Sequence, residues 1–443
     1  MIFSSPAFLL IFFPIYLLIC VGGLASPLVL TFLSIGFFYA NDPSWCIAFI
    51  IWLLILYPII HLQTVTILLK VILLLCPLIL FKYLLGDTID GIAISIPLGI
   101  SFWSFQLITY TTEFNKKRVG IIRYLEYVTF FPQLIAGPIV RAREFLQQNH
   151  LKRTLVRRSK FVTLGCMIFS IGVIKKCGVA DPIIGVLSTL PDDFSSSLLT
   201  LPIWGLACLL AVYFDFTGYS DMAIGLGLMA GIRLPVNFAN PLAFKDPVEF
   251  WNLWHISLTR FFRDYLFNRM VIWSVRRDYP EITTMLIMVF YFFILGLWHG
   301  PTTNFLIFGL LNGLLVTACA VFPAPRGSLA IIGSSIIWHL LIYSSFYFFF
   351  FDPNTIAISI ESLPTIKQTL ILVFCLFLGM IVPDGVYFLK LPGKQGYTNY
   401  LFEARHSLAK VLVHNKALAA PLLLLIALMT TSTSTGSFIY FEF

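Results

Sequence analysis

The stretch TMLIMVFYFFILGLWHGPTTNFLIFGLLNGLLVTACAV at residues 284–321 contains the pattern that decides the fold. Two apolar runs, 284–298 and 303–322, flank a short polar break. Apolar runs of about 20 residues cross the hydrocarbon core of a bilayer as helices, and somewhat shorter runs enter it when they are tilted or paired. The stretch therefore predicts two neighbouring membrane helices with a tight connection.

The composition extends this pattern to the whole chain. Of 443 residues, 59% are hydrophobic and 11% are charged, whereas a soluble domain has about 25% charged residues. A water-soluble enzyme is thereby excluded, and disordered, collagen-like or disulfide-stapled chains need other compositions. Long apolar runs favour helices over a β-barrel, whose strands alternate apolar and polar residues. We expect an all-α, polytopic transmembrane protein with one domain over residues 1–443.

Further apolar segments support this expectation. Several are short for a full crossing, which indicates tilted, re-entrant or interfacial helices. The first has no Lys or Arg before it and reads as a retained span rather than a cleaved signal peptide. Besides the two runs above, the segments are 7–20, 27–40, 45–61, 65–81, 91–111, 161–180, 198–214, 217–230, 329–351, 368–388 and 417–430.

The net charge of +8 lies in loops between these segments. Basic residues mark cytoplasmic loops, so we expect no nucleic-acid partner and instead contact with membrane lipid or anionic ligands. The acidic loops around Asp42, 181–193 and 352–361 are predicted to face outward. The basic clusters, predicted to be cytoplasmic, are 116–123, 141–160, 260–277 and 390–416.

His299 is the most informative polar residue. It is the only Asp, Glu, Lys, Arg or His between Glu281 and Arg326. A helix from Thr283 would place it about 24 Å along, within a core of roughly 30 Å. Gly300-Pro301 should end or kink the helix, and such a break is tolerated where it is buried or lines a cavity. A proton-transfer role and a histidine bonded to a helix-end carbonyl both fit.

A second polar group follows the helix start Asp246-Pro247-Val248-Glu249. Asp as N-cap, Pro at N1 and Glu at N3 are typical of a helix N-terminus. On one continuous helix Asn252, His255, Thr259 and Arg263 would share a stripe. The alternatives are a functional site at Asn252 and His255 or an amphipathic helix at the membrane interface.

A third group is YFDFTGYSDMAIG at 213–225, with Asp215 and Asp221 in an apolar stretch. Buried carboxylates need partners or they protonate. We favour a structural hydrogen-bond hub here. Lys175 and Lys176 are available to pair with these acids, or to extend outward to the interface.

Together these motifs resemble the membrane-bound O-acyltransferase superfamily. LGLWHG (295–300), the helix at 246–267, YFDFTGYSDMAIG and FFPQLIAGPIVR (130–141) are similar to the bacterial branch with alginate O-acetyltransferase and the D-alanyl-lipoteichoic acid transfer protein. PLGISFWSFQLITY (97–110), IKKCGVAD (174–181) and FIYFEF (438–443) match the same branch.

The resemblance implies a ring of about eleven spans, with re-entrant or interfacial helices, around a central tunnel. It implies catalytic roles for His299 and His255, with Asn252 as a further candidate beside them. His299 would be the general base, and His255 or Asn252 would orient groups or stabilise an oxyanion. Arg141 and Arg143 would meet the phosphates of the donor. No metal site is expected.

The resemblance further implies acyl transfer, most simply of acetyl, from a cytoplasmic thioester to a hydroxyl of an exported cell-envelope polysaccharide. The donor would be acetyl-CoA or a phosphopantetheinyl acyl carrier protein, with no tightly bound cofactor. An extracytoplasmic partner or the polysaccharide would accept the group, at the bacterial inner membrane. Phe267-Asn268-Arg269-Met270 looks more like the D-alanyl branch, so D-alanyl transfer toward teichoic-acid-type polymers stays open. A transporter or flippase and a non-catalytic scaffold are the alternatives from other classes.

Overall fold

The computed structural model describes most of the chain. The closing FIYFEF, much of the acidic loop 352–361 and most of the basic cluster 390–416 lie outside the described residues, as do 149–154 and 191–195. The described residues are 3–84, 88–89, 92–93, 96–148, 155–190, 196–197, 200–322, 327–351, 356–357, 364–381, 384, 411–412 and 414–431.

The described chain is helical apart from two pairs of two-residue strands. It has seven helices long and apolar enough to cross a membrane, so the chain is a multi-pass membrane protein, as its sequence predicts. The exact count of spans and the ring around a tunnel stay predictions. The seven are Pro43–His61, Ile67–Leu84, Arg158–Leu187, Leu201–Met229, Glu281–His299, Thr303–Val321 and Ser328–Tyr347, and shorter apolar helices cover Phe8–Gly22, Pro27–Tyr39, Gln368–Gly379 and Leu418–Thr431.

The chain divides into two compact units that interleave in sequence. The first contains residues 1–174, 218–236 and 412–434. The second contains residues 175–217, 237–411 and 435–443. The prediction of one domain over the whole chain stays a prediction, and each unit is described by itself below.

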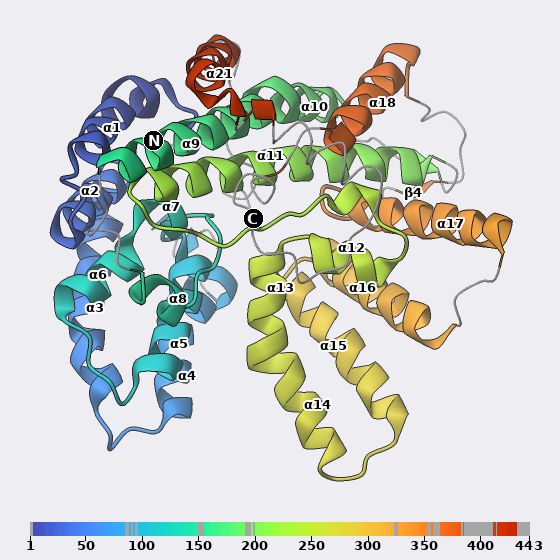
Figure 1. Ribbon diagram of the computed structural model, residues 1–443. Helices are drawn as coiled ribbons and strands as arrows, with labels where there is room; N and C mark the ends of the chain where they lie inside the picture. Colours follow the sequence, from blue (N-terminus) through green and yellow to red (C-terminus); the bar gives the residue numbers. More distant parts are fainter. Residues whose placement is uncertain are drawn as a thin grey trace. The chain divides into compact units, whose positions relative to one another are not determined.

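In the first unit, a short turn joins α3 and α4 into an antiparallel hairpin (Figure 1). The hairpin end is held by Lys70, which is buried and donates hydrogen bonds to the carbonyls of Ile60 and Leu62, both 2.7 Å away. The elements are η1 (Phe8–Phe12), α1 (Phe13–Gly22), α2 (Pro27–Tyr39), α3 (Pro43–His61), α4 (Ile67–Ile79), η2 (Leu80–Leu84), β1 (Thr88–Ile89), antiparallel β2 (Ile92–Ala93), α5 (Ile100–Phe114), α6 (Ile121–Thr129), α7 (Phe131–Leu134), α8 (Ala142–Leu146), α9 (Leu155–Val173) and α21 (Lys416–Thr431).

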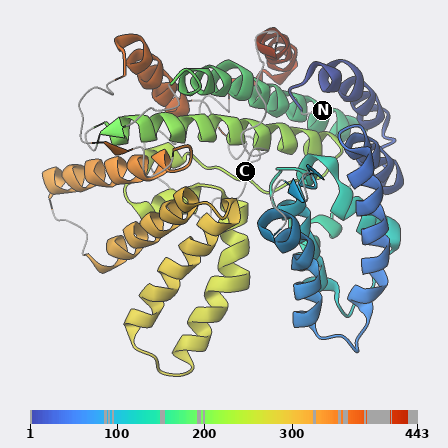
Figure 2. The same cartoon turned by 180° about the vertical axis from the view of Figure 1, so that it is seen from behind.

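In the second unit, α13, η6 and α14 form one rod, and α15 returns beside it (Figures 1 and 2). The elements are η4 (Ile174–Ala180), which continues α9 as a π-helix, α10 (Asp181–Leu187), β3 (Ser196–Ser197), α11 (Leu201–Met229), the 3-10 turn η5 (Pro241–Ala243), α12 (Pro247–Leu253), α13 (Ile256–Phe262), η6 (Arg263–Phe267), α14 (Asn268–Val275), α15 (Glu281–His299), α16 (Thr303–Val321), α17 (Ser328–Tyr347), β4 (Ile356–Ala357), which pairs in parallel with β3, and α18 (Ile366–Ile381). The last turns of α11, from Gly218, belong to the first unit.

Helices α15 and α16 approach each other backbone to backbone. A Cβ on Gly296 would lie 2.3 Å from the carbonyl oxygen of Phe305, and one on Gly309 would lie 2.6 Å from that of Phe292. Small residues permit this distance between membrane helices. This close approach of Gly296 and Gly309 fixes the connection between the helices, where His299 lies.

Three predicted segments have different boundaries in the structure. The runs 198–214 and 217–230 form a single helix, α11, because Gly218 alone does not end a helix and the polar residues between the runs are helical. In the run 91–111, the described helix begins at Ile100. Gly99 has φ +71°, a left-handed conformation that glycine adopts easily, and it precedes the helix start.

Candidate active site

His299 is the last residue of α15. Its helix ends there because Gly300 is fully extended, with φ 173° and ψ 164°, and Pro301 follows. The imidazole is 8% exposed and lies among aromatic rings. The ring centroids of Phe349, Phe305 and Phe308 lie 4.8, 5.6 and 6.2 Å from that of His299. The predicted helix break is confirmed, and it places an imidazole in an aromatic environment.

His255 lies at a break between two short helices. The predicted capping by Asp246 is confirmed, since its Oδ1 accepts a hydrogen bond from the Glu249 backbone N–H, 2.8 Å away. However, α12 ends at Leu253, and His255 has φ 41° and ψ 51° before α13 begins. The predicted continuous stripe is therefore wrong. His255 is 1% exposed, whereas Asn252 lies at the end of α12 and is exposed.

The break at His255 is stabilised by an irregular segment, 237–239, that lies beside it. The backbone N–H of Ile256 donates to the carbonyl of Asn237 at 2.8 Å, and that of Ala239 donates to the carbonyl of Leu253 at 3.1 Å. The hydroxyl of Ser257 also donates to Oδ1 of Asn237. These bonds use backbone groups that a continuous helix would have used itself. The left-handed conformation of His255, uncommon outside glycine, is thus fixed from both sides.

Trp298 connects the two histidines. Its indole lies edge-on to the ring of His255, with centroids 6.0 Å apart, and 4.6 Å from the ring of His299. On the other side of His255, the ring of Phe216 lies 4.6 Å away. The structure therefore brings His255 and His299 into one aromatic cluster of the second unit.

Hydrogen bonds between helices hold this cluster together. Trp251 on α12 donates from Nε1 to Oδ1 of Asn312 on α16, 3.2 Å away. Asn312 in turn donates to Oγ of Ser345 on α17, 3.1 Å away. Tyr291 on α15 donates to the carbonyl of Thr259 on α13 at 3.1 Å. Both helices that flank His255 are thus tied to the helices that flank His299.

The environment of His255 determines its charge. Burial lowers the pKa of its imidazole from 6.5 to about 3, because desolvation disfavours the charged form. His255 is therefore neutral at physiological pH. A neutral imidazole has one N–H donor and one acceptor nitrogen, so it can donate a hydrogen bond to a developing oxyanion without carrying a charge.

The acidic stretch of α11 is an ion-pair hub, as predicted for Asp215. Lys176 Nζ lies 2.6 Å from Oδ1 of Asp215 and 2.7 Å from Oδ1 of Asp181. Its neighbour Lys175 pairs with a different acid, Asp384, at 2.9 Å. Asp221 is also buried, but it belongs to the first unit.

Arg141 and Arg143 lie at the start of α8 in the first unit. Arg143 is exposed, and its backbone N–H donates to Oε2 of Glu113 at 2.7 Å. The Gly137-Pro138 turn before them is buried and tight, since a Cβ on Gly137 would lie 2.2 Å from the carbonyl oxygen of Pro132. The arginines and the histidines thus belong to different units.

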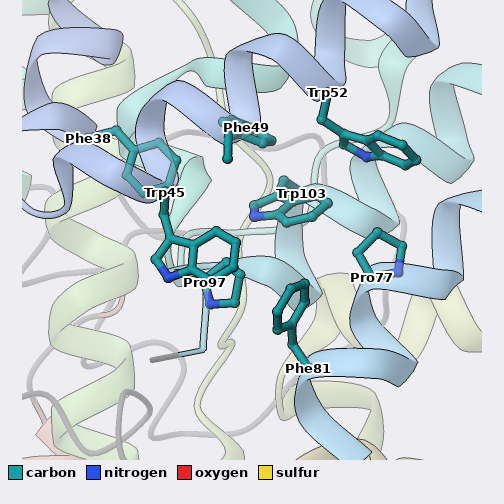
Figure 3. Close-up of a pocket in the computed structure, with 9 residues that line it drawn as sticks. Phe38, Trp45, Phe49, Trp52, Pro77, Phe81, Pro97 and Trp103 are labelled. Atoms are coloured by element: carbon teal, nitrogen blue, oxygen red, sulfur yellow. The ribbon is translucent and has the colours of Figure 1, made fainter. Parts of the chain in front are cut away.

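A cavity of about 190 Å³ lies in the first unit, lined only by apolar and aromatic residues. Figure 3 shows the ring of Trp103 at its centre, with Trp45 and Phe81 beside it. It contains none of the candidate residues, and its lining offers no general base. In the part of the chain that the structure describes, no group of three or more His, Cys, Asp or Glu could hold a metal ion.

Sequence reasoning missed Asn237, Asn312 and Asp384. Asn312 and Asp384 were detectable by the argument that selected His299, since each is a polar side chain within a predicted apolar segment. Asn237 lies in the connection after α11, where a polar residue is ordinary, and no local pattern distinguishes it.

Comparisons with known proteins identify the family of the chain. The model of the membrane-bound O-acyltransferase family matches residues 104–323, which include both histidines. The chain is 32% identical to the probable alginate O-acetylase of Pseudomonas aeruginosa over 372 residues, 74% of this chain and 68% of that protein. It is 32% identical to the peptidoglycan O-acetyltransferase of Helicobacter pylori, over 54% of this chain and 50% of that protein. It is 29% identical to the teichoic acid D-alanyltransferase of Bacillus subtilis, over 51% and 59%.

The fold and the site define a multi-pass helical membrane protein with two buried histidines joined by an indole. The chain belongs to the membrane-bound O-acyltransferase family. Its matches span from about half to two thirds of the length of these relatives.

Proposed function

We propose that this protein is an O-acyltransferase of a bacterial inner membrane. It moves an acyl group, most simply acetyl, from a cytoplasmic thioester to a hydroxyl, for O-acylation of an exported cell-envelope polysaccharide. The observation that carries the proposal is the joining of His255 and His299 by Trp298, on helices that hydrogen bonds hold together. The acetyl-transferring relatives support the choice of acyl group.

His299 is the general base in this proposal. An acceptor hydroxyl has a pKa far above 7, so it must lose its proton as its oxygen attacks the thioester carbonyl. A positioned base contributes about 10²–10⁴-fold to such a step. The carbon–sulfur bond then breaks, and the departing thiolate takes the proton from the imidazolium of His299. The ester and the free thiol are the products, and no oxidant or reductant is needed.

His255 stabilises the tetrahedral intermediate. The attacked carbonyl oxygen becomes an oxyanion, which needs donors about 3 Å away. A buried, neutral imidazole held by backbone hydrogen bonds is a preorganised donor of this kind. Asn252 is the second candidate donor from the sequence, and its exposed position makes it the weaker one.

The donor enters from the cytoplasmic face as acetyl-CoA or as the phosphopantetheine arm of an acyl carrier protein. Arg141 and Arg143 meet its phosphates in this proposal, and the exposed side chain of Arg143 is accessible for such a contact. A ring of about eleven spans around a tunnel would let the acyl group reach an extracytoplasmic partner or the polysaccharide.

D-alanyl transfer from a carrier protein is the second candidate, and the similarity to teichoic acid D-alanyltransferases supports it. Its chemistry at His299 is the same. A transporter would use His299 and the buried ion pairs to line a substrate path, and a scaffold would need neither histidine.

One experiment separates these functions. Envelope polymer is isolated from cells with the wild-type protein, the His299→Ala variant and a deletion, and ester-linked acyl groups are measured by mass spectrometry. We expect the ester to disappear in both altered strains. Normal esterification with a stably folded His299→Ala protein would refute the enzyme function, and the mass of the lost group distinguishes acetyl from D-alanyl.

A further inference from the structure

Asp384 lies in a buried site of the second unit, where donors from four of the described residues hydrogen-bond to its carboxylate. Its Oδ1 accepts from Lys175 Nζ at 2.9 Å, from the Tyr213 hydroxyl at 3.0 Å and from the Thr217 hydroxyl at 3.2 Å. Its Oδ2 accepts from the backbone N–H of Asn240 at 2.9 Å. The carboxylate is 1% exposed, and so many donors stabilise its charged form.

The backbone contact of Asp384 is at a residue with an uncommon conformation. Asn240 has φ 62° and ψ 55°, in the left-handed region, which asparagine adopts more readily than most residues other than glycine. Such a conformation persists where its surroundings enforce it, and it often occurs near functional sites. The bond from Asn240 to Asp384 is one such constraint.

Two routes lead from Asp384 to His255. The first is the backbone, since Asn240 follows the segment whose residues Asn237 and Ala239 hydrogen-bond on both sides of His255. The second runs through α11. The hydroxyls of Tyr213 and Thr217 hold α11 to Asp384, and Phe216 on the same helix lies against the His255 ring.

We propose that Asp384 is a positioning residue for His255, and that its carboxylate holds segment 237–240 and helix α11 so that the imidazole keeps its place beside Trp298. The inference rests on the proposed function for its effect on catalysis, but not for its effect on His255. Asp384 touches none of the reacting atoms and acts through its neighbours.

The competing role is that of a buried ion pair that only contributes to stability. Removing one partner of such a pair leaves an unpaired buried charge, whereas replacing both by apolar residues is often neutral. Charge-neutral double variants distinguish the positioning role from a role in stability alone. Lys175→Met with Asp384→Asn keeps an acceptor for the Asn240 N–H and a polar group for the two hydroxyls. Lys175→Met with Asp384→Leu keeps neither.

The test compares these two doubles in purified full-length protein. The kcat and the KM for acetyl-CoA are measured, together with the thermal midpoint in detergent and the ¹⁵N signals of labelled histidine. The chain has seven histidines, and His255→Gln assigns the signal of interest. Lys70→Met is the control, because Lys70 is, like Lys175, a buried lysine that donates hydrogen bonds, but it lies in the first unit.

We expect the Asn double to retain kcat within a few-fold and the His255 signal in place. The Leu double should move the His255 signal and lose at least about tenfold in kcat, as small displacements of catalytic groups do, with KM unchanged. Lys70→Met should leave the His255 signal unmoved. Equal kcat and equal His255 signals in two folded doubles would overturn the inference.

If the Leu double cannot be purified folded, Tyr213→Phe combined with Thr217→Val removes two donors to Asp384 without a change in charge. An unmoved His255 signal in that variant would overturn the inference as well. The proposed function fails separately, through full acyl transfer by His299→Ala, and the His255 signals remain interpretable in that case.

Discussion

The ring of His255 lies edge-on to the indole of Trp298, with 6.0 Å between their centroids. These residues are 43 positions apart in the sequence, and Trp298 directly precedes His299. The side chain of Trp298 therefore contacts both candidate catalytic groups, and the first prediction concerns it.

Trp298→Phe should lower kcat by about tenfold or more, because a smaller ring leaves space in which both imidazoles can shift. Its KM for acetyl-CoA should stay unchanged. Trp298→Ala should in addition lower the free energy of unfolding by about 3–5 kcal/mol, since it removes a large buried ring. Steady-state kinetics measure kcat and KM, and thermal unfolding in detergent measures the loss of stability. Trp273→Phe, at a half-exposed ring, is the control.

His299→Gln should reduce kcat by about 10²–10⁴-fold, the contribution of a positioned general base. Glutamine can form a hydrogen bond but cannot take a proton near neutral pH. The readout is thiol release from acetyl-CoA in the presence of a hydroxyl acceptor. His414→Gln is the control, because His414 is exposed. Activity of His299→Gln close to wild type would assign the base to another residue.

The stability of the protein should depend on pH through His255. Its folded pKa of about 3 is below the ordinary 6.5, so between these values the unfolded chain binds a proton that the folded chain does not. The contribution of His255 to stability is therefore complete above pH 6.5 and falls as the pH is lowered. The thermal midpoint of the wild type relative to His255→Gln should decrease from pH 7 to about pH 5. A constant difference would contradict the lowered pKa.

Gly296→Ala should destabilise the protein, while Gly333→Ala should not. Both glycines lie inside helices, where alanine is favoured by about 1 kcal/mol. At Gly296 the new methyl group would meet the Phe305 carbonyl oxygen at 2.3 Å, whereas at Gly333 no atom of the described residues lies within 4 Å apart from the glycine's own stretch of helix. Overpacking of this kind costs about 1–3 kcal/mol. The thermal midpoints of the wild type and the two variants, measured in the same detergent, test this prediction.

Local sequence signals were sufficient to predict the helix ends at the candidate site. Gly300 and Pro301 end α15 as their backbone preferences require, and Asp246 caps α12. His299 was selected because a titratable side chain at membrane depth is energetically costly and is usually functional or paired. Each of these predictions depended on residues within a few positions of one another.

The break at His255 was not predictable in this way. The residues around it contain no proline or glycine, so none of them forbids one continuous helix. The break exists because Asn237 and Ala239 provide backbone hydrogen bonds, and Asp384 stabilises the segment that they belong to. Lys175 and Asp384 are 209 positions apart, and no local pattern pairs them.

The close approach of Gly296 and Gly309 affects how α15 and α16 respond to bilayers of different thickness. Where side chains separate two helices, a change in bilayer thickness can alter their spacing by changing rotamers. At Gly296 and Gly309 the two main chains are in direct contact, so no side chain between them can change its rotamer to adjust the spacing. A thinner or thicker bilayer should tilt α15 and α16 together as a rigid pair. The connection that contains His299 would then keep its geometry when a cell changes the composition of its lipids.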